Sequence, residues 1–217
     1  MHKNIYYPFR KINMGGDAKL IGKHAEVAKT MLRKITDLFD KLEIEYILDF
    51  GTLLGVVREN RLLPWDTDLD ISITHKDLEK LIKNKRKLWR LGYRTRVRYF
   101  DKDTGPFKKG EVRIIKVQTR KFVVVRDKGI LDIFVMKNID GEYSYVVKKE
   151  GASVLKTIPT EFHDNKTRIE FDNKQYSVPK DYERYLEYVY GDWRTPVKEW
   201  DYFLGDNTVK KVYGKDE

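Results

Sequence analysis

The chain of 217 residues contains no cysteine, so neither disulfide bonds nor thiolate metal sites can contribute to it. It also has no apolar stretch near the roughly 18 residues that a membrane-spanning helix needs. The first residues, MHKNIYYPFRKINMGGDAK, lack the apolar region of a secretory signal peptide. No internal repeat or low-complexity segment interrupts the sequence. These absences lead us to expect a cytoplasmic protein, with the inner face of the membrane as a second location.

What is present suits one globular unit. Hydrophobic residues make up 41% of the chain, and its length is enough to bury a substantial core. We expect a single domain over residues 1–217, with its core over about 17–200 and a polar tail after residue 200 that frays.

Basic residues are concentrated in one segment. The formal net charge is +10, and residues 74–130 alone hold 19 Lys and Arg against 6 Asp and Glu. This segment could attract a nucleotide diphosphate, an anionic glycan, acidic lipid headgroups or a nucleic acid, or it could simply be a solvated surface. Within it, Arg94, Arg96 and Arg98 alternate with Thr95 and Val97, and as a strand they would form one basic face. We consider Arg94 and Arg96 candidates for contact with a substrate phosphate.

The run DFGTLLGVVRENRLLPWDTDLDISI, residues 49–73, is the most informative part of the sequence. Asp68 and Asp70 are two residues apart, so on a strand they would share one face while Leu69, Ile71 and Ile73 point to the other. Adjacent carboxylates repel each other unless something compensates, and a bound divalent cation is a common solution. We therefore predict a metal site for Mg²⁺, with Mn²⁺ as the alternative. Asp66 extends the pattern as a further ligand, or else it caps the preceding turn.

The first half of this run predicts an anion site. The change from a strand pattern to a helix pattern falls at Gly51 and Thr52, and a helix start there would offer free backbone N–H groups. The Thr52 hydroxyl is a further donor, and Arg58 lies nearly two turns on, where its guanidinium could hold a phosphate oxygen. Each half of the run taken alone is more often an ordinary turn or cap.

Together these residues resemble a known family. The pattern G-T-L-L-G-x-x-R followed by P-W-D-x-D-x-D resembles the LicD family, whose relatives include fukutin and fukutin-related protein. The resemblance continues at Gly129–Val135 and at Val178–Pro196. It implies an α+β, nucleotidyltransferase-like fold in which helices flank a mixed β-sheet core. It also implies transfer of phosphocholine, or a polyol phosphate such as ribitol phosphate, from a CDP-linked donor to a glycan hydroxyl.

Asp132 lies in an apolar run, between Leu131 and Ile133, where a carboxylate is costly unless it is paired or bound to metal. One reading makes it the partner of an arginine or a backbone amide. With the resemblance included, we favour a third carboxylate that completes the metal site or accepts the proton of the incoming hydroxyl.

Three functions remain open from the sequence. The leading one is a phosphotransferase with a CDP-linked alcohol as donor and a glycan as acceptor, releasing CMP. The second is a nucleotidyltransferase acting on a small molecule or nucleic acid, and the third is a non-catalytic basic module that binds glycan or nucleic acid. Under the leading reading we expect no stable nucleic-acid partner, and peripheral association with a membrane through the basic segment stays open.

Periodicity and turn signals predict the scaffold. Helices are predicted at 17–42, from 51, at 75–91 and at 181–190. Strands are predicted at 46–49, 68–74, 93–100, 112–119, 122–125, 130–136, 143–147, 168–171 and 175–178, with a turn-rich break at 101–110.

Overall fold

A computed structural model describes residues 18–121, 125–197 and 200–214 of the chain. Its helices are α1 (Lys23–Lys41), α2 (Phe50–Glu59), α3 (His75–Arg90), α4 (Glu161–Asp164) and α5 (Tyr182–Tyr190). Its strands are β1 (Tyr46–Leu48), β2 (Leu69–Thr74), β3 (Tyr93–Tyr99), β4 (Val112–Lys121), β5 (Val125–Ile139), β6 (Glu142–Lys149), β7 (Ala152–Pro159), β8 (Lys166–Phe171), β9 (Lys174–Pro179) and β10 (Val209–Tyr213).

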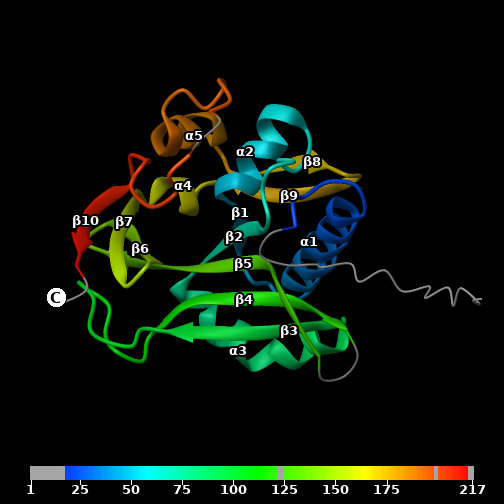
Figure 1. Ribbon diagram of the computed structural model, residues 1–217, viewed down its shortest axis with the longest axis horizontal. Helices are drawn as coiled ribbons and strands as arrows, with labels where there is room; N and C mark the ends of the chain where they lie inside the picture. Colours follow the sequence, from blue (N-terminus) through cyan, green and yellow to red (C-terminus); the bar gives the residue numbers. More distant parts are fainter. Residues whose placement is uncertain (1–17, 122–124, 198–199, 215–217) are drawn as a thin grey trace, which may run out of the picture.

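A mixed β-sheet organises these elements (Figure 1). Strand β5 is its centre: it pairs in parallel with β2 and antiparallel with β4, which in turn pairs with β3. Strand β1 is antiparallel to β2 at the other edge. The last residues of β5 leave β4 and pair with β6, and β7 and β10 follow in antiparallel order. The predicted α+β class, with a mixed sheet flanked by helices, is confirmed.

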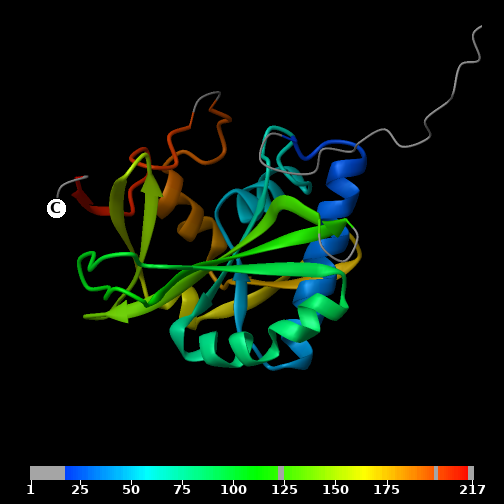
Figure 2. The same cartoon turned by 60° about the horizontal axis from the view of Figure 1, so that its bottom comes forward.

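The two faces of the central strands differ in chemistry, and the helices divide between them. On β2 the side chains of Leu69, Ile71 and Ile73 are buried in the main core, where α1 and α3 supply the opposing apolar side chains. Helix α3 lies on one side of the sheet, and α2 with α5 on the other (Figure 2). This arrangement buries one face of the central strands in the main core, whereas the other face carries Asp70 and Asp132 on the side of α2.

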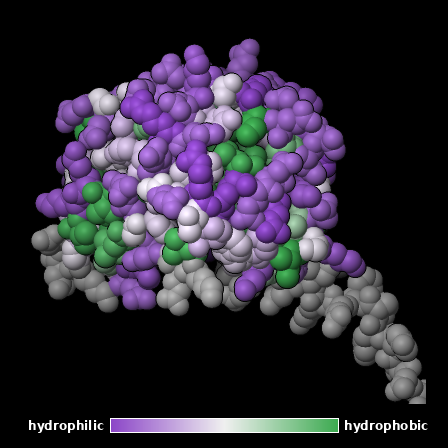
Figure 3. Space-filling view, turned by 90° about the horizontal axis from the view of Figure 1, so that it is seen from above, coloured by the Kyte–Doolittle hydropathy of each residue, from purple (hydrophilic) through white to green (hydrophobic). Residues whose placement is uncertain are grey.

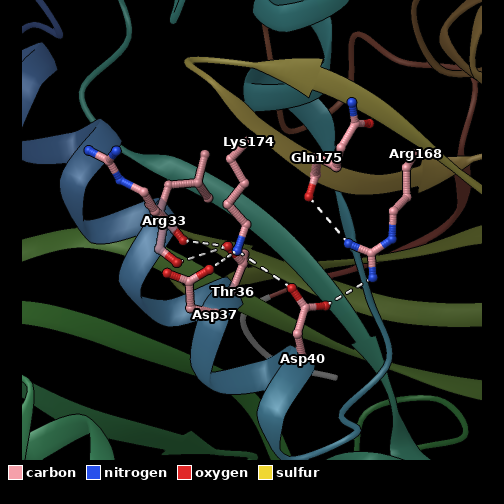
Figure 4. A network of polar contacts seen from close by, with 8 residues as sticks. Arg33, Thr36, Asp37, Asp40, Arg168, Lys174 and Gln175 are labelled. Atoms are coloured by element: carbon pink, nitrogen blue, oxygen red, sulfur yellow. Dashed lines mark hydrogen bonds and ion pairs between the residues drawn. The ribbon is translucent and has the colours of Figure 1, made fainter.

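The β8–β9 hairpin is fastened to α1 by ion pairs (Figure 4). Lys174 contacts both Asp37 and Asp40, and Arg168 contacts Asp40 at 3.1 Å. The hairpin turn at Asp172 and Asn173 has φ values of 48° and 58°, a left-handed conformation that Asn and Asp adopt more readily than most residues. The hairpin thus packs beside β1 and is linked to α1 by these ion pairs.

Most predicted elements are confirmed, with shifts at their ends. The first helix begins at Lys23, because Gly22 before it has a φ of 51° that interrupts the helix, and Asp17, where the predicted helix starts, lies outside the described residues. The strand predicted at 130–136 is part of the longer β5, and residues 122–124 of the strand predicted before it lie outside the described residues.

Two strands and one short helix were not predicted. Strand β7 and helix α4 fall in a stretch to which we assigned no structure. The prediction of a fraying tail after residue 200 is wrong for 209–213, because these residues form β10, which pairs with β7.

The surface seen from above in Figure 3 is mostly hydrophilic, and its hydrophobic areas are separated from one another. Trp65, Trp200, Tyr202 and Leu204 are among the large hydrophobic residues that stay exposed. No helix in the described part of the chain is long and apolar enough to cross a bilayer.

A buried ion pair and an exposed one should contribute very differently to stability. The side chains of Lys156 and Asp206 are 1% and 7% exposed and form an ion pair, whereas Asp37, which pairs with Lys174, is 50% exposed. We expect Asp206→Ala to lower the free energy of unfolding by about 3 kcal/mol, because it leaves a buried ammonium without a counter-charge. Asp37→Ala should cost less than about 1 kcal/mol. Urea denaturation of both variants measures the difference, and equal losses would contradict this account.

Candidate functional site

The parallel register of β2 and β5 brings two of the predicted carboxylates together. Asp70 and Asp132 are Cα partners across the two strands, so their side chains leave the same face of the sheet. Asp68, just before β2, and Asp66 lie close enough to Asp70 to change its protonation. We call Asp66, Asp68, Asp70 and Asp132 the acidic cluster.

Burial raises the pKa of Asp66, Asp68 and Asp70, and the charges of neighbouring carboxylates add to this for Asp68 and Asp70. Burial is the larger cause for Asp68, whose pKa rises to about 7, and the charges of Asp66 and Asp132 add to it. Burial, followed by the charge of Asp68, raises the pKa of Asp70 well above its ordinary value. The pKa of Asp66 is also raised by burial. At neutral pH a positive charge placed among these groups would relieve both effects.

The start of α2 lies against this cluster. A Cβ atom built on Gly51 would collide with Oδ2 of Asp66 and would lie 3.8 Å from Oδ2 of Asp70. The absence of a side chain at Gly51 therefore makes the space in which these carboxylates sit. The backbone N–H of Asp70 donates to Oγ1 of Thr52 at 2.8 Å, which fastens β2 to the first turn of α2.

The second glycine of the motif has a different role. A Cβ on Gly55 would lie 2.6 Å from the carbonyl oxygen of Arg61 and 3.0 Å from the backbone nitrogen of Leu63. Because both are backbone atoms, the chain after α2 can fold back only over a glycine. Gly51 opens the site, and Gly55 shapes the loop that leads to Asp66.

The donor atoms of the acidic cluster suit a hard divalent cation. Carboxylate oxygens are the ligands that Mg²⁺ and Mn²⁺ prefer, and the space beside Gly51 is of the kind that a side chain would otherwise fill. In the conformation described, no three His, Cys, Asp or Glu side chains of residues 18–121, 125–197 and 200–214 are already arranged as metal ligands. The metal role of these residues thus stays a prediction that their chemistry fits.

Asp132 has a basic partner. Nζ of Lys116 lies 2.6 Å from its Oδ2, and the two residues are Cα partners on β4 and β5. The reading that gave Asp132 an ion-pair partner is thus observed, with a lysine in place of the arginine. Asp132 also lies beside Asp70, and its role as a third metal ligand stays a prediction.

The predicted phosphate-binding arginines occupy two different places. Arg96 is the Cα partner of Lys116, and both Arg94 and Arg96 are exposed on β3. Arg58 is instead engaged elsewhere: it donates to the carbonyl oxygen of Trp193 at 3.1 Å and pairs with Glu59. The structure gives Arg58 a role in holding the segment at Trp193 against α2, and its contact with a phosphate remains a prediction.

Sequence reasoning missed Asp49. It caps α2 by accepting from the N–H of Phe50 at 2.8 Å, and the hydroxyls of Ser72 and Tyr185 also donate to it. Burial raises its pKa to about 6. Asp49 thus joins β2, α2 and α5 directly behind the acidic cluster. The available signal was an aspartate between a buried strand and the glycine that opens a helix.

Alanine at the two glycines of the motif should change stability by different amounts. Gly51→Ala should leave stability within about 1 kcal/mol of the parent, because alanine favours the helix and the clashing atom is the mobile end of Asp66. It should nevertheless weaken binding of Mg²⁺. Gly55→Ala should cost at least about 2 kcal/mol, because backbone atoms must move. Urea denaturation and calorimetric titration with Mg²⁺ measure both effects, and a stability loss at Gly51 equal to that at Gly55 would refute the assignment.

Protons and Mg²⁺ should compete for the acidic cluster. Because the pKa of Asp68 is raised to about 7, this carboxylate is protonated below that pH and cannot act as a metal ligand. The rise in melting temperature on adding Mg²⁺ should therefore be small at about pH 5.5 and larger at about pH 8. Differential scanning fluorimetry measures it, with Asp68→Asn as the variant that loses the response. A rise that is the same at both pH values would contradict the prediction.

Comparisons with known proteins place the chain in a family context. An uncharacterized protein of Rickettsia prowazekii (strain Madrid E) is 36% identical over 75 residues, which are 35% of this chain and 28% of that protein. An uncharacterized protein of Rickettsia typhi (strain ATCC VR-144 / Wilmington) is 38% identical over 64 residues, 30% of this chain and 21% of that protein. The chain thus matches about a quarter of the length of these relatives.

A structural comparison gives a weak likeness. The crystal structure of ANT(2″)-Ia in complex with adenylyl-2″-tobramycin is 15% identical, with a TM-score of 0.38, and the match covers 74% of this chain and 76% of that one. The comparison with protein families gives the more informative result. The family model described as LicD/FKTN/FKRP, nucleotidyltransferase domain, matches residues 43–181, which include α2, the acidic cluster and the strands around it. The chain belongs to the LicD/FKTN/FKRP nucleotidyltransferase-domain family.

Proposed function

We propose that this protein is a metal-dependent phosphotransferase. It moves a phospho-alcohol, phosphocholine or a polyol phosphate such as ribitol phosphate, from a CDP-linked donor to a hydroxyl of a cell-surface glycan. The observation that supports this most strongly is the pairing of Asp70 with Asp132 in parallel register beside the open start of α2. Membership of the LicD/FKTN/FKRP family supports a transferase and suggests the class of donor and acceptor.

The residues divide into two groups with complementary tasks. The acidic cluster, with Asp68, Asp70 and Asp132 as its main members, would hold one or two Mg²⁺ or Mn²⁺ ions. Such ions, when bound, would supply positive charge that offsets the charge developing on the diphosphate. The first turn of α2, at Gly51 and Thr52, would receive a phosphate through its free backbone N–H groups.

The proposed reaction is a displacement at phosphorus. The glycan hydroxyl attacks the phosphorus distal to the cytidine, a new P–O bond to the glycan forms, and the P–O bond to CMP breaks. The proton of the hydroxyl is accepted by a carboxylate, for which Asp132 is our candidate. Arg94 and Arg96, exposed on β3, would steer the anionic donor toward the acidic cluster.

A second function has one observation in its favour, since the family model is described as a nucleotidyltransferase domain. In that reaction the acceptor attacks the phosphorus next to the nucleoside, and pyrophosphate leaves. The same acidic cluster would serve both reactions, so the identity of the leaving group separates them.

The direct test is product analysis. The purified protein is incubated with Mg²⁺, a glycan acceptor and one donor at a time. The donors are CDP-choline, CDP-ribitol, CDP-glycerol and nucleoside triphosphates. We expect release of CMP from one CDP-linked alcohol. Asp68→Asn and Asp70→Asn should each lower kcat/KM about 100-fold or more, because they remove metal ligands.

Asp103→Asn is the matched control, since Asp103 lies in an exposed loop and pairs with Lys108 and a backbone N–H. It should retain the parent's activity. Release of pyrophosphate from a nucleoside triphosphate would replace the proposal with the second function. Unchanged activity in Asp68→Asn and Asp70→Asn would remove the acidic cluster from either reaction.

A further inference from the structure

Lys116 is the one cation that forms an ion pair with the acidic cluster among the residues that the structure describes. It projects from β4 toward Asp132, and its Nζ lies 2.6 Å from Oδ2 of that residue. The side chain of Asp132 is 10% exposed, whereas that of Lys116 is 34% exposed. The carboxylate is therefore held in the site, and the ammonium has room to move.

Two cations held at one carboxylate repel each other. A metal ion bound at Asp132 would lie close to the ammonium that already contacts Oδ2 of this residue. Lys116 thus already supplies positive charge at the carboxylate that the proposed metal would use. Its four-carbon stem is flexible and carries the charge as a compact point, so it can leave one anion for another nearby.

Lys116 lies on the same face of the sheet as the two carboxylates and Arg96. Arg96, Lys116, Asp132 and Asp70 are Cα partners in one row across β3, β4, β5 and β2. A diphosphate bound to metal at Asp132 would bring negative charge close to the Lys116 ammonium, which already lies at this carboxylate. That anion would offer the ammonium a partner in exchange for Asp132.

We propose that Lys116 is an exchange residue of this site: it pairs with Asp132 when the site is empty and with the donor's diphosphate when metal and donor are bound together. The inference rests on the proposed function for the presence of metal and diphosphate, but it concerns the role of Lys116 alone. The consequence is coupling between the binding of metal and the binding of a diphosphate. Metal alone binds weakly because Lys116 competes with it, and metal with a diphosphate binds well because the competitor becomes a ligand of the diphosphate.

Calorimetric titration separates these effects. The Kd for Mg²⁺ is measured with and without saturating CDP, a diphosphate that lacks the alcohol. In the parent, CDP should tighten Mg²⁺ binding about fivefold or more. In Lys116→Met, Mg²⁺ alone should bind about fivefold more tightly than to the parent, and the tightening by CDP should be largely lost.

Two variants control for charge and folding. Lys85→Met makes the same charge change at an exposed position on α3 and should titrate like the parent. Lys116→Arg keeps the charge beside Asp132 and should keep weak binding of Mg²⁺ alone. If Lys116→Met does not fold, as judged by circular dichroism, Lys116→Gln takes its place with the same expectation.

The outcomes distinguish this inference from the proposed function. If Lys116→Met binds Mg²⁺ no more tightly than the parent does, or keeps the full effect of CDP, the exchange role is wrong even where CMP is released from a CDP-linked alcohol. If the exchange is seen with both CDP and ADP but no CDP-linked alcohol reacts, Lys116 has the proposed role and the proposed donor is wrong.

Discussion

The parallel pairing of β2 with β5 is the constraint on which the site depends. Asp70 lies between Leu69 and Ile71, Asp132 lies between Leu131 and Ile133, and the register sets the two aspartates directly beside each other. A shift of either strand by one residue would turn its carboxylate into the core that α1 and α3 cover. The apolar residues on the opposite face of β2 and β5 fix that register, so the hydrophobic core determines where the charges lie. Packing of the core thus holds these carboxylates side by side although they repel one another.

The sequence predicted the parts of this arrangement that depend on local patterns. Alternation of Asp68 and Asp70 with apolar residues was enough to assign one polar face to β2, and the glycine at the head of α2 marked the start of the helix. The α+β class was confirmed because helix and strand periods are distinct in this chain. The resemblance to the LicD family linked Asp132 to the same site, a link that no local pattern could supply.

What the sequence could not show depends on contacts between distant elements. Lys116 is one of many lysines in a basic segment, and only the antiparallel register of β4 with β5 distinguishes it from the rest. Asp49 was overlooked for a similar reason, because its partner Tyr185 lies 136 residues away on α5. Strand β10 is short and largely polar, and its pairing with β7, rather than any strand pattern, gives it order. Arg58 carried a strong motif signal, yet its hydrogen bond to Trp193 gives it a structural task.

The central claim is that the acidic cluster binds metal and a diphosphate at one place. A crystal structure of the protein grown with Mn²⁺ and a CDP-linked alcohol tests it most directly, because Mn²⁺ scatters anomalously and can be located without assumptions about the ligand. The account predicts an anomalous peak bound by carboxylate oxygens of Asp68, Asp70 and Asp132, with the diphosphate between that peak and the first turn of α2. A diphosphate bound elsewhere, or Mn²⁺ absent from these carboxylates at saturating concentration, would contradict it.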